Sequence, residues 1–420
     1  MVKRKPNRDG GGKRRASQAR ALGTMILGSM LFLPGVLAAA EPPPANMDWS
    51  AVQKLMKRVD ELEAEVKALR ARDSLRPTTA AAPVTEAAIP KETFPQISFH
   101  GFGDINYRFS NESGSKNAFA LGQLDFFVTS RIAENLSILN ETVIEANEEN
   151  NFGIEIERLL LQYRGTDWFN LDVGRYHTSV GYYNTAYHHG TWFQTAVGRP
   201  QFLDFEDGGG LIPAHNVGVS AHGAIPSGSL NLAYVLEVGN GRPYHPVGSA
   251  KAPVLNVSDD NEYKSVNLAL MVKPDSIPGL QAGIGAYHDT LTPDNLSRTD
   301  ELLLHAHVVF KNSVWEFLNE GFLMRHSERL GPTHYTPAAY TQLARTFGKL
   351  RPFVRFSYVN APDADPALSL IGANGLRWGP SLGIRYDFSD FAALKFQYDR
   401  VQRGGEGNIN QFTSQLAFTF

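Results

Sequence analysis

Cysteine is absent from the 420 residues of this chain. Its absence excludes a disulfide framework, a thiolate zinc site and a cysteine nucleophile, and it suits an oxidising compartment. Long apolar runs are scarce as well, and a mean hydropathy of −0.25 excludes a bundle of membrane-spanning helices. A membrane barrel is not excluded, because its strands alternate polar with apolar residues and the average cancels.

An excess of positive charge is absent outside the N-terminus. The formal net charge is −3, but residues 1–40 hold eight Lys and Arg against one Asp, so the remainder carries about −10. This balance argues against a surface that binds nucleic acid. The sequence also has no phosphate-cradling glycine motif, and we expect no cofactor and no resident metal.

Residues 1–40 are predicted to be an export signal. A basic start is followed by an apolar stretch and by three alanines that end at residue 40 and suit a cleavage site. The alternative is an uncleaved membrane helix. Pro34 and Gly35 lie where such a helix should continue, and no stop-transfer pattern follows.

A short heptad pattern follows a spacer at 41–46. Within 47–73, apolar residues recur at the a and d positions of three heptads, which predicts a coiled coil. Those residues are Val52, Leu55, Val59, Leu62, Val66 and Leu69. The alternative is a lone amphipathic helix. In a coiled coil, β-branched residues at a with leucine at d favour two helices over three. Residues 74–96 are rich in Pro and Ala and are predicted to be an extended linker.

From residue 97 the apolar pattern changes to a period of two, which indicates β-strands. Most of these segments reach the roughly 9–11 residues that a tilted strand needs to cross a bilayer. The sixteen predicted strands are 97–109, 119–132, 136–146, 152–164, 168–178, 215–225, 229–239, 263–273, 280–289, 301–311, 314–326, 338–347, 350–359, 377–388, 391–401 and 411–420.

The connections between these segments alternate between short and long. Short turns at one end and longer loops at the other, with an even number of strands, are typical of a bacterial outer-membrane barrel. The alternative is a large soluble β-sandwich, which would not sort its loops by length. We therefore predict an all-β, antiparallel transmembrane barrel over 97–420.

The third long connection, 179–214, is the longest and is rich in aromatic residues. A long structureless loop in a compact domain is usually functional or disordered, and disordered segments are poor in aromatics. We expect it to fold into the pore. Two irregularities are also expected: a bulge near Arg158, where the alternation breaks, and Pro380 near the outer rim, since a closed barrel offers proline no free edge.

The final segment alternates apolar with polar residues and ends at Phe420. The signal, the strand-dense body and this ending resemble a Gram-negative porin. The coiled coil, Gly101-Phe102-Gly103-Asp104 and Val173-Gly174-Arg175-Tyr176 resemble the phosphate-selective porin O/P type. The resemblance implies a homotrimer in outer-membrane lipid, a terminal Phe that the barrel-assembly machinery reads, and a third loop that forms a constriction.

The strand face opposite the apolar band would line the lumen. The cations expected at the pore or its constriction are Arg108, Arg131, Arg175, Arg199, Arg345, Arg355, Arg385 and Lys395. The loop carboxylates Asp204, Glu206 and Asp207 are expected to face Arg131, Arg175 and Arg355. The wall is either a set of mutually paired ions or one side of a transverse field.

Other chemistry is weakly indicated. Ser381 lies in a Gly-Pro-Ser-Leu-Gly sequence that matches a nucleophile elbow, but no helix is predicted after it. The pairs His305 with His307 and His188 with His189 lack a third metal ligand, and residues 258–262 lack the spacing of a calcium loop. An enzyme is not expected. Two functions remain open: a passive porin for small hydrophilic or anionic solutes, and a tether from the outer membrane to the cell wall through the coiled coil.

Overall fold

The computed structural model describes residues 94–146, 151–187, 190–204, 210–246, 257–259, 261–405 and 407–420. The predicted export signal, spacer and coiled coil, and all but the last residues of the linker, lie outside this part of the chain. Among the described residues, no helix is both long enough and apolar enough to cross a membrane.

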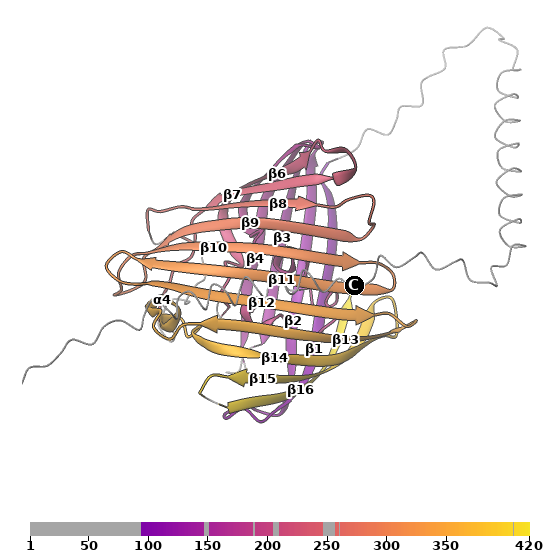
Figure 1. Ribbon diagram of the computed structural model, residues 1–420. Helices are drawn as coiled ribbons and strands as arrows, with labels where there is room; N and C mark the ends of the chain where they lie inside the picture. Colours follow the sequence, from indigo (N-terminus) through magenta and orange to yellow (C-terminus); the bar gives the residue numbers. More distant parts are fainter. Residues whose placement is uncertain are drawn as a thin grey trace, which may run out of the picture. The chain divides into compact units, whose positions relative to one another are not determined.

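The described residues form sixteen antiparallel strands that close into one barrel (Figure 1). Successive strands pair along the chain, and β1 pairs with β16 from Phe102↔Thr419 to Ser110↔Gln411, which confirms the predicted closed barrel. The strands are β1 (Gln96–Ser110), β2 (Ala118–Ala133), β3 (Leu136–Ala146), β4 (Phe152–Thr166), β5 (Phe169–His177), β6 (His215–Ile225), β7 (Leu232–Gly239), β8 (Ser265–Val272), β9 (Leu280–Leu291), β10 (Thr299–Lys311), β11 (Trp315–Glu328), β12 (Thr333–Arg345), β13 (Leu350–Ala361), β14 (Gly375–Asp387), β15 (Ala392–Arg403) and β16 (Gly407–Thr419).

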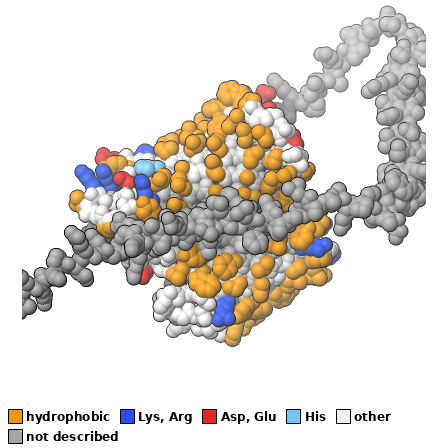
Figure 2. Space-filling model, viewed as in Figure 1, with side chains coloured by type: hydrophobic (Ala, Val, Ile, Leu, Met, Phe, Trp, Pro, Cys, Tyr) orange, Lys and Arg blue, Asp and Glu red, His pale blue; other side chains and the backbone are white. Residues whose placement is uncertain are grey.

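Side chains alternate between an apolar outer face and a polar inner face. In β7, Leu236 and Val238 are 42% and 44% exposed, whereas Glu237 between them is 2% exposed. Figure 2 shows apolar side chains spread over the visible wall, with charged ones mainly near its ends. A soluble sandwich would bury the apolar face instead, so the sandwich alternative is rejected.

Phe420 lies at the seam where the barrel closes. Its N–H donates to Gly101 O at 3.0 Å, and the Gly101 N–H donates to Phe420 O at 3.1 Å. The Phe420 ring lies over Gly101, where an added Cβ would come within 2.5 Å of the ring, and Gly103 accommodates Phe418 in the same way at 2.9 Å. Glycine at both positions lets the two rings lie directly on β1.

A bulge interrupts β4 where the alternation predicts one. Glu141 of β3 pairs with Arg158, and the next pair is Thr142 with Ile156, so Glu157 is the extra residue. Ile156 and Leu159 are exposed on the outer face, whereas Glu157 is buried. The bulge therefore turns both Glu157 and Arg158 toward the inside of the barrel.

The prolines lie deeper in the strands than the sequence indicates. Pro380 pairs with Phe356 inside β14, not at the rim. Pairing of β14 with β15 skips Gly379 and Pro380, because proline has no N–H to donate. Strand β12 begins at Thr333, earlier than predicted, and therefore includes Pro337. The preceding loop is correspondingly shorter, at 329–332.

Within the part of the chain that the structure describes, short helices occupy three connections. They are α3 (Tyr183–Ala186), α4 (Pro366–Leu370) and the 3₁₀ helices η1 (Gln201–Leu203) and η3 (Gly228–Leu230). The segment η3 replaces the first residues of the predicted seventh strand. The helix α4 is capped by Asp365, whose carboxylate accepts from the N–H groups of Ala367 and Leu368.

Candidate functional site: the constricted lumen

The connection between β5 and β6, residues 178–214, begins and ends side by side. The Thr178 N–H donates to Ala214 O at 3.0 Å, which adds one rung to the pairing of the two strands. Asn184 binds both ends, since its Nδ2 donates to Thr178 O at 3.0 Å and to Ala214 O at 2.9 Å. We refer to this connection as the inner loop.

The first part of the inner loop binds carboxylates of the wall. Glu320 of β11 accepts from the N–H groups of Tyr182 and Tyr183 and from the Tyr340 hydroxyl, the latter two at 2.9 and 2.7 Å. Glu237 of β7 accepts from the Ser179 N–H at 3.0 Å. Because both carboxylates project from strands, these bonds place the start of the loop against the inner face.

Apolar side chains of the inner loop then cover one side of the lumen. Phe202 is 0% exposed, and its ring centroid lies 4.9 Å from that of Phe322 on β11. The cluster continues along β9 to β13, and its loop members are Val180, Tyr183, Tyr187, Phe202, Leu203, Leu211 and Ile212. A polar, water-filled interior is usual in a pore, so this cluster closes one side to solutes.

The second part of the inner loop is held by cations of β13 to β15. Arg355 donates to Gly198 O at 2.9 Å and Arg385 donates to Gln194 O at 3.0 Å. Lys395 is 0% exposed and donates to Thr191 O. All three residues therefore bind loop carbonyls. Of the three, only Arg355 was predicted to face a loop carboxylate, and it lines the same cavity as Asp204.

A cavity of about 450 Å³ remains between this part of the loop and the wall formed by β1 and β13 to β16. Arg108, Arg199, Arg355 and Asp204 line it. Arg199 belongs to the loop itself and donates to Asn184 Oδ1 at 2.9 Å. Burial raises the pKa of Asp204 to about 7, although Arg199, Arg377, Arg355 and Arg108 each lower it.

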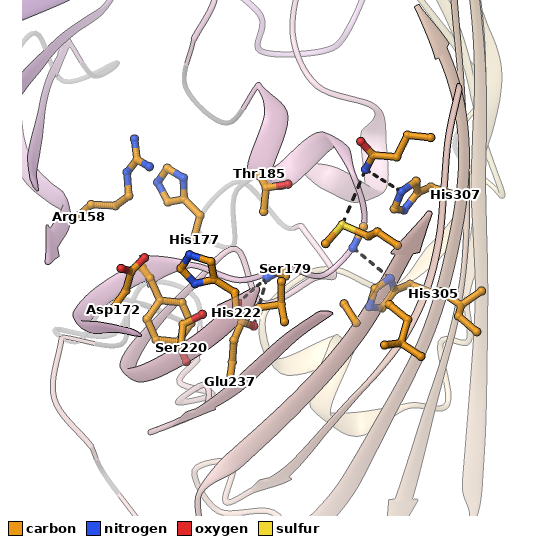
Figure 3. Close-up of a pocket in the computed structure, with 18 of the residues that line it drawn as sticks. Arg158, Asp172, His177, Ser179, Thr185, Ser220, His222, Glu237, His305 and His307 are labelled. Carbon is orange, nitrogen blue, oxygen red and sulfur yellow. Dashed lines mark hydrogen bonds between the residues drawn. The ribbon is translucent and has the colours of Figure 1, made fainter. Parts of the chain in front are cut away.

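A second cavity, of about 310 Å³, lies on the other side of the loop (Figure 3). His177 and His222 lie on one side of it, and His305 and His307 on the other. His305 Nδ1 accepts from the Gly181 N–H at 3.2 Å, and His307 Nε2 lies 3.1 Å from Gln281 Nε2. Both β10 histidines are therefore engaged by neighbouring protein groups.

Three predicted lumenal arginines lie elsewhere. Arg345 is on the outer face, with its guanidinium 4.8 Å from the ring centroids of Trp315 and Phe347, because the inner face of β12 carries the even-numbered residues. Arg131 is at the tight-turn end, 5.3 Å from the Phe94 ring. Arg175 is buried at the root of the loop and donates from Nε to Glu157 O at 3.1 Å.

The remaining predicted residues fall outside the described part of the chain or do not form the predicted geometry. Glu206, Asp207, His188 and His189 lie outside the described residues, as does part of 258–262. Ser381 donates to Asp399 within the β14–β15 pair and is not followed by a helix, so the nucleophile-elbow geometry is not formed. The sequence analysis missed Glu320 and Gln397, although both lie on polar strand faces. Gln397 Nε2 donates to Val197 O at 2.9 Å.

A scan against family models and a search of curated proteins both find no match. Solved structures are similar in fold. The anion-selective porin from Comamonas acidovorans has a TM-score of 0.56 and 11% identity over 78% of this chain and 100% of that one. Salmonella typhi OmpF in complex with daunomycin has a TM-score of 0.56 and 13% identity over 78% of this chain and 98% of that one.

A third similar structure is OmpT of Vibrio cholerae in its trimer form, with a TM-score of 0.52 and 11% identity over 78% of this chain and 99% of that one. At these identities the comparisons show the fold alone. The described residues therefore share the fold of outer-membrane porins, a closed barrel of sixteen antiparallel strands, in a chain that matches no family model.

Proposed function

We propose that this chain is an outer-membrane porin through which small hydrophilic solutes, including anions, diffuse. The observation that carries the proposal is the inner loop. It is bonded to the inner faces of β7, β11, β13 and β15, and it leaves a cavity of about 450 Å³ beside it. A loop fixed across a barrel narrows the lumen without filling it, which is what a size-limiting channel needs.

Charge in this cavity supports a transverse field as the source of selectivity. Arg108 and Arg355 line it from the wall, together with the wall carboxylates Asp104 and Asp399, and Arg199 and Asp204 line it from the loop. Fixed charges in a narrow gap act more strongly on a passing ion than the same charges in bulk water. The resemblance to phosphate-selective porins makes inorganic phosphate the first anion to test.

Purified protein in a planar bilayer tests this function directly. We expect stable conductance steps. In a salt gradient we also expect a non-zero reversal potential, which should approach zero as ionic strength rises, because the Debye screening length shortens to about 10 Å at 0.1 M. Current that phosphate blocks at low salt would extend the proposal to this anion. A correctly folded barrel that conducts nothing would overturn the channel function and favour the tether.

We further propose a homotrimer, as in the trimer form of Vibrio cholerae OmpT. The predicted coiled coil at 47–73 would hold the chains together outside the barrel. Native mass measurement in mild detergent should show three chains, and deletion of 47–73 should weaken assembly while the barrel stays folded. A monomer, or a dimer, under these conditions contradicts the proposal.

Phe420 is proposed to act as the signal for the barrel-assembly machinery. Phe420 is 52% exposed, and its ring packs over Gly101 of the first strand. This contact forms only when the barrel closes, so before closure the ring is free to be bound by the assembly machinery. Phe420→Ala should slow insertion into the outer membrane. Phe412→Ala, which removes another outward ring from the same strand, is the matched control. Equal surface levels of both variants and wild type would contradict the role.

A further inference from the structure

Two histidines stand at the root of the inner loop. His177 is the last residue of β5, and His215 is the first residue of β6. The two pair directly across the strands, and their ring centroids are 5.4 Å apart. They are far apart in the sequence, so no spacing motif marks them.

A carboxylate from a third strand completes the group. The bulge in β4 turns Glu157 inward, and one ligand atom from each of Glu157, His177 and His215 lies within 4.8 Å of the other two. The three residues are 2%, 9% and 5% exposed. A second carboxylate is close, since Glu141 Oε2 is 3.4 Å from His177 Nε2.

We propose that Glu157, His177 and His215 bind a divalent transition-metal ion, with Zn²⁺ as the best-fitting probe, and that the ion fixes the root of the inner loop. Two imidazoles and one carboxylate, with a fourth position left for water or Glu141, form an established Zn²⁺ ligand set. Bonds of about 2.0–2.2 Å would bring the three ligand atoms somewhat closer together, which side-chain rotation can provide.

Carboxylates surround the group. Asp125, Glu141 and Glu157 are buried with Arg175, and Arg158 beside them is half-buried. Asp125 is 1% exposed, and neither of its carboxylate oxygens accepts a hydrogen bond from the described residues. Buried carboxylates are normally paired or bound to a metal, and a divalent cation at Glu157 would give these carboxylates a further partner.

An ion can reach the group from the lumen, because His177 lines the cavity of about 310 Å³. Arg175 opposes binding, since its Nη2 is 3.9 Å from the Glu157 carboxylate. It also donates to the Glu157 backbone oxygen, which holds the bulge in place. The ion would link β4 to both ends of the loop, and the loop sets the constriction.

Zinc titration of the full-length protein, refolded after removal of metals, tests the site. We expect one tightly bound Zn²⁺ per chain by calorimetry, with two imidazole ligands by X-ray absorption. The double variant His177→Ala/His215→Ala should lose it. Glu157→Gln keeps nearly the same shape and should weaken binding by about tenfold or more, so it decides the matter if the double variant does not fold.

Two controls remove histidine pairs elsewhere. His305→Ala/His307→Ala and His188→Ala/His189→Ala should both keep the bound ion. Absence of zinc binding in the wild type, or binding that survives both His177→Ala/His215→Ala and Glu157→Gln, overturns the site. Zinc should also reduce the current fluctuations of single channels in the wild type but not in Glu157→Gln. Bound zinc without this change overturns the link to the loop.

Discussion

The two parts of the inner loop are attached to the barrel by different physics. Residues up to 187 bind buried carboxylates through their N–H groups. Together with Phe202, Leu203, Leu211 and Ile212 they also pack apolar side chains against β9 to β13. Residues 191–199 are instead held at their carbonyls by the long side chains of Arg355, Arg385, Lys395 and Gln397. We call the part that is packed against the wall the sealed part, and residues 191–199, which are held by long side chains, the suspended part.

The difference explains where a pore can exist. Close-packed apolar side chains leave no space for water, so the sealed part blocks its side of the lumen. A long cationic side chain bridges a gap while its charge stays near the water-filled space. The suspended part borders the cavity of about 450 Å³, and one of the residues that hold it, Arg355, also places its charge in the lining of this cavity.

Removal of the suspended part should have the largest effect. Replacing residues 191–199 with a short Gly-Ser linker should raise single-channel conductance about twofold or more, because the narrowest cross-section sets the resistance. The sealed part would stay attached through Glu320 and the apolar cluster. Unchanged conductance would show that the loop does not limit the passage and would break the comparison.

Truncating an apolar anchor should loosen the sealed part. Phe202→Ala removes a ring that is 0% exposed, and core changes of this kind cost about 3–5 kcal/mol. Single-channel records should show added current noise and more frequent closures. Phe193→Ala, at a loop ring that is 53% exposed, is the matched control and should behave much like the wild type. Equal noise in both variants would contradict the distinction.

Neutralising one suspending cation should change selectivity more than loop position. Arg355→Gln keeps a donor for the loop carbonyls but removes the charge, so the anion-to-cation permeability ratio should fall roughly twofold at low salt. Arg345→Gln removes an equal charge from the outer face and should leave the ratio unchanged. Reversal potentials in a salt gradient measure both. A shift of equal size in the two variants would contradict the assignment of faces.

Acidification should produce the smallest change. Burial raises the pKa of Asp204 to about 7, so this carboxylate is charged above that pH and neutral below it. As pH falls through this value, the reversal potential should move toward anions. Asp204→Asn should show the anion-shifted value at every pH. A pH step that persists in this variant would assign the titration to another group.

The sequence alone predicted most of the barrel. Period-two alternation needs only neighbouring residues to sort one face to lipid and the other to water, and loop lengths alternate because the strands are antiparallel. The sixteen strands, the outward Leu236 and Val238, the bulge beside Arg158 and the long third connection could all be recognised this way. The depth of Pro380 in the barrel could not be predicted, because it depends on the pairing of β14 with β13 and β15.

Only the tertiary structure decided which residues form the constriction. Arg345 and Arg355 are both arginines in neighbouring strands, yet the register of β12 with β13 sends one outward and the other to the loop. The loop meets β11, β13 and β15 through contacts that span more than a hundred residues, which no local pattern encodes. The Glu157, His177 and His215 group forms because the bulge in β4 and the pairing of β5 with β6 bring these three side chains together.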